Sequence, residues 1–240
     1  KAGLSLPNEI IDDGRIHRFS SNGKTTDNAG WYVLFTDGIA AGAFGCWREG
    51  VNIKWCSVNE SNLTQPEKHE FNKKIAEAKK QREEEEERNR AKARNKANNI
   101  WTQSTEAPTN HPYLLSKKVQ PHGLKLSRGK LVVPLYDQNQ ILQSLQFIGP
   151  DGDKKFLVGG RTKGCYYPIG GAPDKILYVA EGFATAATVH EATGSAVAVA
   201  FNANNLKPVA IALRAKFPNL EMVICADDDH QTKGNPGIRK

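Results

Sequence analysis

The stretch from Ile176 to Asp229, ILYVAEGFATAATVHEATGSAVAVAFNANNLKPVAIALRAKFPNLEMVICADDD, decides the fold of this 240-residue chain. It predicts three continuous apolar strands separated by two helices, in the order 176–180, 183–193 (closed by Gly194), 196–201, 208–217 and 222–226. Strands that are apolar on both faces and alternate with helices are typical of a parallel sheet covered on both sides. The sequence therefore predicts an α/β fold for this part of the chain.

Acidic and amide side chains follow the three predicted strands. They are Glu181, Asn202 and the run from Asp227 to Asp229. In an open parallel sheet the functional site lies off the carboxyl ends of the strands. Carboxylates gathered there repel one another unless a cation neutralises them, and Mg²⁺ prefers such hard oxygen ligands together with phosphates. The alternative is that these acidic residues only cap the helices that follow.

Basic residues prevail in the same half of the chain. The whole protein has a net charge of +7, and residues 101–240 carry 16 basic and 11 acidic residues. The loop Gly159-Gly160-Arg161-Thr162-Lys163 combines glycines with two cations, which suits a phosphate group. We expect Arg161 to matter more than Lys163, because a guanidinium grips phosphate through two parallel bonds. The alternative is a solvated surface loop.

Residues 15–56 predict a small antiparallel sheet. Short alternating or apolar runs occur at 15–19, 31–35 and 51–55, and Asp37-Gly38 between two apolar runs indicates a hairpin. The segment shows no cluster of titratable residues with catalytic spacing. We therefore expect a binding or docking module.

A long helix follows, from Thr64 to about Ile100. Thr64 and Glu67 form a capping box around Pro66, and 19 of the 36 residues 65–100 are charged. Apolar residues support one face only in the first half. The second half is therefore expected to be a solvated or partly disordered spacer, and deleting whole turns from it should leave the C-terminal half intact. An arm that binds nucleic acid is the alternative.

Residues 105–172 predict a connector and a second β-rich unit. A short helix is expected at 113–117, and strands at 130–136, 140–148, 155–158 and 165–169. No apolar run reaches the length of a membrane helix, and the first residues lack the apolar core of a signal peptide. The four cysteines have no C-x-x-C spacing, which argues against a zinc site and against a disulfide scaffold and fits a reducing cytoplasm.

The hexapeptide Glu181-Gly182-Phe183-Ala184-Thr185-Ala186 resembles the EGYATA motif of primases from satellite phages and conjugative plasmids. That motif is the glutamate motif of the Toprim domain, and Asp227-Asp228-Asp229 resembles the D-x-D motif of the same fold. Residues 105–172, with HPYLLSKK, KKFLVGG and GCYYPIG, resemble the subdomain that precedes Toprim in DnaG-type RNA polymerase cores. Phe183 departs from the motif's tyrosine, and the zinc ligands that such primases often carry are not recognisable.

The resemblance implies a division into four parts. These are a β-rich N-terminal domain (1–62), a long charged helix or linker (63–102), a mixed α+β subdomain (103–172) and a Toprim domain (173–240). The last would be a parallel Rossmann-like sheet with flanking helices, and we expect it to be truncated by one βα unit at the C-terminal end.

The resemblance also implies roles for individual residues. Glu181 would act as acid/base or as a metal ligand at the primer 3′-hydroxyl, and Asp227 and Asp229 would hold Mg²⁺ or Mn²⁺, with Asp228 as a further candidate ligand. Residues expected to bind nucleotide or nucleic acid are Lys155, Arg161, Lys163, Asn202, Asn205 and Lys233.

The function implied is that of a DNA primase, a nucleotidyltransferase that makes short RNA primers on single-stranded DNA for phage or plasmid replication. Its expected partners are the template, ribonucleoside triphosphates and a replicative helicase, present as a further domain or a separate protein. Two alternatives stay open: a Toprim nuclease or topoisomerase-like enzyme, and a catalytically silent Toprim scaffold that binds nucleic acid.

Overall fold

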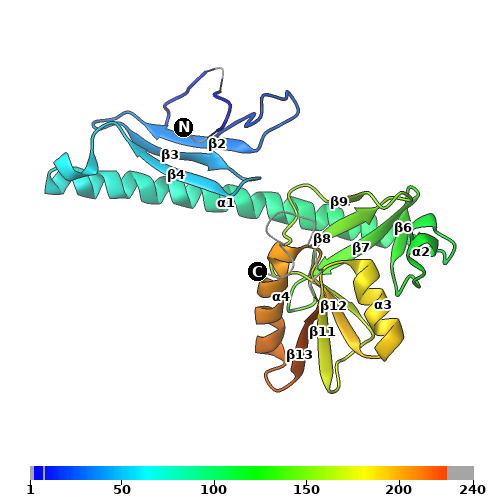
Figure 1. Ribbon diagram of the computed structural model, residues 1–240. Coiled ribbons are helices and arrows are strands. Elements are labelled where there is room, and N and C mark those ends of the chain that lie inside the picture. The colour runs from blue at the N-terminus through cyan, green and yellow to red at the C-terminus, as the bar shows by residue number, and fades with distance from the viewer. Residues whose placement is uncertain (1–2, 8, 226–240) are drawn as a thin grey trace. The chain divides into compact units, whose positions relative to one another are not determined.

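A computed structural model describes residues 3–7 and 9–225 (Figure 1). The chain divides into two compact units, residues 1–88 and 89–240. Strands and helices are mixed in both, so the predicted α/β class is confirmed. None of the helices in the described ranges has the length and apolar character needed to span a bilayer.

The first unit is built on one antiparallel sheet in the order β1-β2-β3-β4. Its elements are β1 (His17–Phe19), β2 (Gly30–Phe35), β3 (Ala41–Cys46), β4 (Val51–Cys56), a 3₁₀ turn (Glu60–Asn62) and the first part of α1 (Gln65–Gln103). The expected hairpin at Asp37-Gly38 joins β2 to β3, with Phe35 opposite Ala41. Gly38 has φ +71°, a conformation that glycine adopts without strain.

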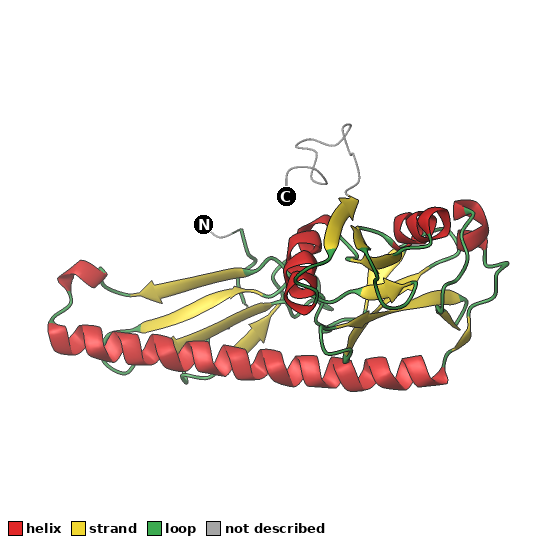
Figure 2. Ribbon diagram, turned by 90° about the horizontal axis from the view of Figure 1, so that it is seen from below, coloured by secondary structure: helices red, strands yellow, loops and turns green. Residues whose placement is uncertain are grey.

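One face of this sheet packs on α1 (Figure 2). Trp31 and Val33 of β2 are buried with Ala78 of the helix. At the helix start the Glu67 carboxylate makes its half of the predicted capping box, accepting hydrogen bonds from the Thr64 backbone N–H at 2.7 Å and from the Thr64 hydroxyl at 2.6 Å. The apolar first half of the helix is therefore a structural part of the N-terminal unit.

The second half of α1 is not a solvated spacer, contrary to the prediction. Ala93 and Ala97 are buried against Leu142, Leu145 and other apolar residues of a five-stranded sheet in the second unit. The sequence did not indicate this buried face, because two small alanines four residues apart give little apolar periodicity in a helix that is otherwise polar. The helix end belongs to the core of the second unit, and deleting turns from it would remove that packing.

The described part of the second unit, residues 89–225, forms two sheets. The first is antiparallel, in the order β5-β6-β7-β8-β9, and the second has the order β10-β12-β11-β13. Their strands are β5 (Thr105–Glu106), β6 (Lys125–Ser127), β7 (Lys130–Tyr136), β8 (Leu142–Ile148), β9 (Lys154–Phe156), β10 (Tyr167–Ile169), β11 (Ile176–Ala180), β12 (Ala196–Val199) and β13 (Glu221–Cys225). The helices are α2 (Pro112–Lys117), α3 (Phe183–Thr193) and α4 (Ala203–Lys216).

The β11, β12 and β13 strands are parallel, as their apolar sequences predicted. The antiparallel edge strand β10 precedes residue 173, so the expected boundary at 172/173 falls between two strands of one sheet. The α4 helix begins five residues before the predicted start at Pro208, which lies inside it. A proline this early in a helix removes one hydrogen bond of its second turn, and the buried side chains Leu206 and Val209 anchor the helix on either side of it.

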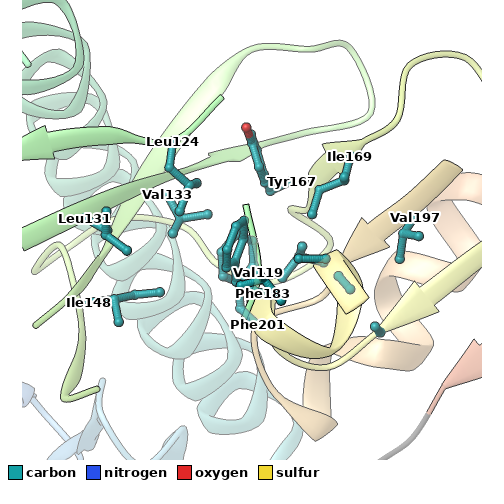
Figure 3. Close-up of a cluster of buried hydrophobic side chains, with 14 of the residues drawn as sticks. Val119, Leu124, Leu131, Val133, Ile148, Tyr167, Ile169, Phe183, Val197 and Phe201 are labelled. Carbon is teal, nitrogen blue, oxygen red and sulfur yellow. The ribbon is translucent and has the colours of Figure 1, made fainter. Parts of the chain in front are cut away.

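Helices cover the parallel sheet on both faces. Leu206, Val209 and Leu213 of α4 pack on one face, and Phe183, Ala186 and Ala187 of α3 pack on the other. The α3 face shares one core with the five-stranded sheet, and this core includes Val119, Phe183 and Phe201 (Figure 3). This shared core fixes the two sheets of the second unit against each other.

A histidine–glutamate contact joins the loop before β6 to α3. The Glu191 carboxylate lies 2.6 Å from Nε2 of His122 and accepts the Gln120 backbone N–H at 2.8 Å. Although partial burial acts to raise it, these hydrogen bonds and the neighbouring His190 hold the pKa of Glu191 below its ordinary value of 4.5. A depressed carboxylate pKa stabilises the fold above the unfolded-state value, and the contribution is lost as the pH falls through the folded-state value.

We therefore expect Glu191→Gln to be less stable than wild type near neutral pH, with a difference that shrinks below about pH 4.5. Urea titrations from pH 6 down to pH 3 measure this. A stability difference that is independent of pH would contradict it.

Candidate active site

Glu181 lies at the carboxyl end of the central strand of the parallel sheet. It follows Ala180, the last residue of β11, and precedes Gly182, the N-cap of α3. Its side chain is half-buried. The glycine lets the chain pass from strand to helix without a side chain beside the carboxylate. The sequence prediction for the position of Glu181 at a strand end is confirmed.

Asn202 marks the carboxyl end of β12. It occupies the N-cap position of α4, is half-buried and makes no side-chain capping bond. The preceding Phe201 has φ +74°, a left-handed conformation that is costly for a bulky residue and that clusters at functional sites. The Phe201 ring packs edge-on against Phe156 of β9, with centroids 6.1 Å apart, so β9 lies over this end of the parallel sheet.

The third strand end brings the chain to the same edge. β13 ends at Cys225, the Cα partner of Ala180. The predicted ligands Asp227, Asp228 and Asp229, and the predicted nucleotide contact Lys233, lie outside the described residues. Of the predicted catalytic set, the structure therefore describes Glu181.

The lysine pair of β9 contains a residue that sequence reasoning missed. The predicted contact Lys155 is exposed and pairs with Asp153 at 3.0 Å. The Nζ atom of Lys154 lies 3.7 Å from the point that a Cβ atom on Gly182 would occupy, next to Glu181. Neighbouring strand residues point to opposite faces, so only one of the two can reach the carboxyl edge. The sequence shows two adjacent lysines, but which of them lies on which face of β9 follows only from the pairing of β9 with β8.

The Arg161 side chain forms an ion pair and a hydrogen bond within the protein. Its guanidinium lies 3.5 Å from Oδ2 of Asp137, a buried carboxylate, and its Nε donates to Sγ of Cys165 at 3.5 Å. Burial raises the pKa of the Cys165 thiol, although the Arg161 charge acts in the opposite direction. Part of the guanidinium is thus already engaged within the protein, and the role of Arg161 as the stronger phosphate contact stays a prediction.

Lys163 is the exposed cation of the basic loop. Its side chain forms no ion pair with any residue in the described ranges 3–7 and 9–225. Gly160 fixes the loop beneath it, since a Cβ atom there would lie 2.1 Å from the Ser144 hydroxyl. Arg161 is engaged within the protein and Lys163 is exposed, and the expected ranking of the two cations as phosphate contacts stays a prediction.

Asn205 is a buried brace. It is 3% exposed, and its amide bonds only to backbone groups, at Ala200, Thr162, Gly164 and Cys165. These groups belong to the end of β12 and to the basic loop. These contacts give Asn205 an internal structural role, and its expected contact with nucleotide stays a prediction.

A Mg²⁺ or Mn²⁺ ion at this edge would need oxygen ligands. Glu181 supplies hard carboxylate oxygens of the kind that Mg²⁺ or Mn²⁺ prefers. Within residues 3–7 and 9–225, no three side chains of the metal-binding types gather closely enough to hold an ion. The described part therefore offers one predicted ligand, and the others follow β13.

A cavity of about 440 Å³ lies elsewhere, in the N-terminal unit. Its walls include Leu6, Tyr32, Phe44 and Trp55, and none of the described residues that line it is charged. Phosphoryl transfer needs groups that bind phosphate and move protons. The carboxyl edge of the parallel sheet is therefore the better candidate for an active site.

Comparison with known families agrees with this architecture. Residues 176–240 match the family model described as the Toprim domain. The match begins at β11 and so contains Glu181, Asn202 and Asn205. No solved structure was found to match the chain.

Two relatives from Escherichia coli, both named DNA primase TraC, are similar over nearly the whole chain. One is 36% identical over 247 residues, which cover 96% of this chain and 23% of the relative. The other is 35% identical over 252 residues, which cover 96% of this chain and 17% of the relative. The chain thus spans less than a quarter of the length of these curated relatives. The chain carries a Toprim domain, and the resemblance to a Toprim primase that its sequence indicated is confirmed.

Proposed function

We propose that this chain is the RNA-polymerase core of a DNA primase that makes short RNA primers on single-stranded DNA for plasmid or phage replication. The observation that carries the proposal is the position of Glu181. It lies at the carboxyl end of β11, inside the segment that matches the Toprim domain, and the cation of Lys154 lies close to the next residue, Gly182. The similarity to two proteins named DNA primase supports the same reaction.

The proposed reaction is nucleotidyl transfer. The 3′-hydroxyl oxygen of the primer forms a bond to the α-phosphorus of a ribonucleoside triphosphate, and the bond from that phosphorus to pyrophosphate breaks. Glu181 accepts the hydroxyl proton as general base, or would help to hold a metal ion that, when bound, would lower the pKa of the hydroxyl. Lys154 and Lys163 bind phosphate oxygens and offset the negative charge of the substrates.

Mg²⁺ or Mn²⁺ is proposed as the cofactor, held by Glu181 together with Asp227 and Asp229, and with Asp228 as a further candidate. When bound, the ion would neutralise charge on the triphosphate and orient it for in-line displacement. A soluble location in a bacterial host and a replicative helicase as partner belong to the same proposal.

The direct test is primer synthesis by the 240-residue chain. Labelled ribonucleotides are incubated with the protein, single-stranded DNA and Mg²⁺ or Mn²⁺, and the products are resolved by length. Template-dependent RNA products support the proposal. Cleavage or relaxation of DNA without synthesis would favour a Toprim nuclease or topoisomerase, and DNA binding without any reaction would favour a silent scaffold.

The exposed cation of the basic loop gives a second test. We expect Lys163→Ala to weaken binding of nucleotide or single-stranded DNA about tenfold, since a charged hydrogen bond contributes about 1.5–3 kcal/mol. If the partner is DNA, the slope of log affinity against log salt should fall by about 0.7 for the lost phosphate contact. Fluorescence titrations at several salt concentrations measure both quantities.

Lys175→Ala is the matched control for this test. Lys175 is exposed and precedes β11, at the amino end of the same sheet, so its loss removes the same charge from the opposite edge. Its variant should bind as wild type does. Equal weakening in both variants would show that only net charge matters and that the loop is no phosphate site.

A further inference from the structure

The side-chain amide of Asn205 forms hydrogen bonds only to backbone groups outside its own helix, α4. Its Oδ1 accepts the Gly164 backbone N–H at 2.8 Å. Its Nδ2 donates to the carbonyls of Ala200 at 2.8 Å, Cys165 at 3.0 Å and Thr162 at 3.1 Å. None of these groups belongs to α4, where Asn205 lies in the first turn. The side chain therefore connects the end of β12 to both sides of Lys163.

A second buried polar residue holds the same loop from the other sheet. Asp137 is 6% exposed and lies between β7 and β8. Its Oδ2 accepts from Nε2 of Gln143 at 2.8 Å and pairs with Arg161 at 3.5 Å. The loop is thus fixed before and after Lys163, whose own side chain is left exposed between the two attachments.

Several backbone N–H groups in and next to this loop already donate hydrogen bonds within the protein. The Gly160 N–H bonds to the Leu157 carbonyl at 3.2 Å, and the Cys165 N–H bonds to the Thr162 carbonyl at 3.0 Å. With the Gly164 N–H bonded to Asn205, a phosphate at this loop depends on the Lys163 ammonium rather than on these amides. The affinity then depends on how well the ammonium is placed before the ligand arrives.

We propose that Asn205 is a positioning residue for phosphate binding: it holds Lys163 over the carboxyl edge of the parallel sheet, at the end of β12. The inference rests on the proposed function, because it assigns the loop to the phosphate-bearing substrates of that site. The phosphate belongs either to the incoming nucleotide or to the DNA backbone. Separate titrations with ATP and with labelled oligothymidylate distinguish these sources.

The test is a double-mutant cycle between Asn205 and Lys163. Asn205→Asp keeps the size and the acceptor but removes the donors to three carbonyls, so the loop should lose its attachment. Alone, it should weaken binding of the same ligand that Lys163→Ala affects, by about fivefold to tenfold. In the double variant the loss should barely exceed that of Lys163→Ala alone, because both changes act through one contact.

Two further variants separate positioning from general stability. Val209→Ala removes buried side-chain volume from the same helix without touching the loop, and it should leave binding unchanged. Asn205→Ala removes the amide without burying a charge, and it replaces the aspartate variant if that protein does not fold.

Additive losses in the cycle, or wild-type binding by the Asn205 variants, overturn the inference while primer synthesis by the wild type still supports the proposed function. A Lys163→Ala protein that binds both ligands normally also overturns it. A wild-type protein that makes no primers and binds neither ligand refutes the proposed function itself.

Discussion

Glu181→Gln is expected to fold as wild type does and to lose primer synthesis by about 10²- to 10⁴-fold, the usual contribution of a positioned acid or base. Glutamine keeps the length and polarity of the side chain at the end of β11 but cannot accept the proton or supply an anionic ligand. Initial rates of labelled primer formation, with circular dichroism to verify the fold, measure the effect.

Glu221→Gln is the matched control for this substitution. Glu221 begins β13 and is exposed, and it pairs in register with Ile176 at the opposite edge of the same sheet. Its loss removes one carboxylate from that sheet without touching the candidate site. Near-normal synthesis by the Glu181 variant, or an equal loss in the Glu221 variant, would overturn the assignment of Glu181.

Ala97→Glu is expected to destabilise the second unit by about 3–5 kcal/mol, the cost of an uncompensated charge in a protein interior. Ala97 is fully buried against the five-stranded sheet, close to Leu142 and Leu145. A carboxylate there has neither room nor a cation to pair with among those apolar neighbours. Urea unfolding followed by circular dichroism measures the change in free energy of unfolding.

Asn99→Glu provides the comparison within the same helix. Asn99 is exposed two residues later, so it adds the same charge on the solvent side. Its effect should stay within about 0.5 kcal/mol. Equal free energies of unfolding for the two variants would contradict the burial of Ala97 and favour a solvated spacer for this half of α1.

Local sequence was sufficient to predict the bounds of an element where a single apolar or capping pattern marks it. The apolar run 176–180 and the helix 183–193 with its Gly194 C-cap were predicted with the bounds that the structure has. The position of Glu181 followed from the same pattern, because a parallel strand brings the residue after it to the carboxyl edge. The start of α4 was missed because Pro208 resembled a helix beginning, whereas buried neighbours hold it inside the helix.

Side-chain partners distant in sequence decided the rest. Arg161 is paired with Asp137, 24 positions earlier, and Asn205 with a loop about 40 positions earlier. Neither contact leaves a trace in local composition, since a cation or an amide looks the same whether it faces solvent or a buried partner. The proximity of Lys154, rather than Lys155, to Gly182 likewise depends on strand register, which pairing with β8 sets.

Three features could be predicted from the sequence alone: the α/β class, the parallel direction of the last three described strands and the edge of the sheet at which Glu181 lies. These features follow from apolar periodicity, which each segment carries within itself. Only the tertiary structure shows that the end of α1 is part of the core of the second unit and that Arg161 pairs with the buried carboxylate of Asp137. Those outcomes depend on which surfaces meet when the chain packs, and burial is a property of the assembled contacts rather than of any one segment.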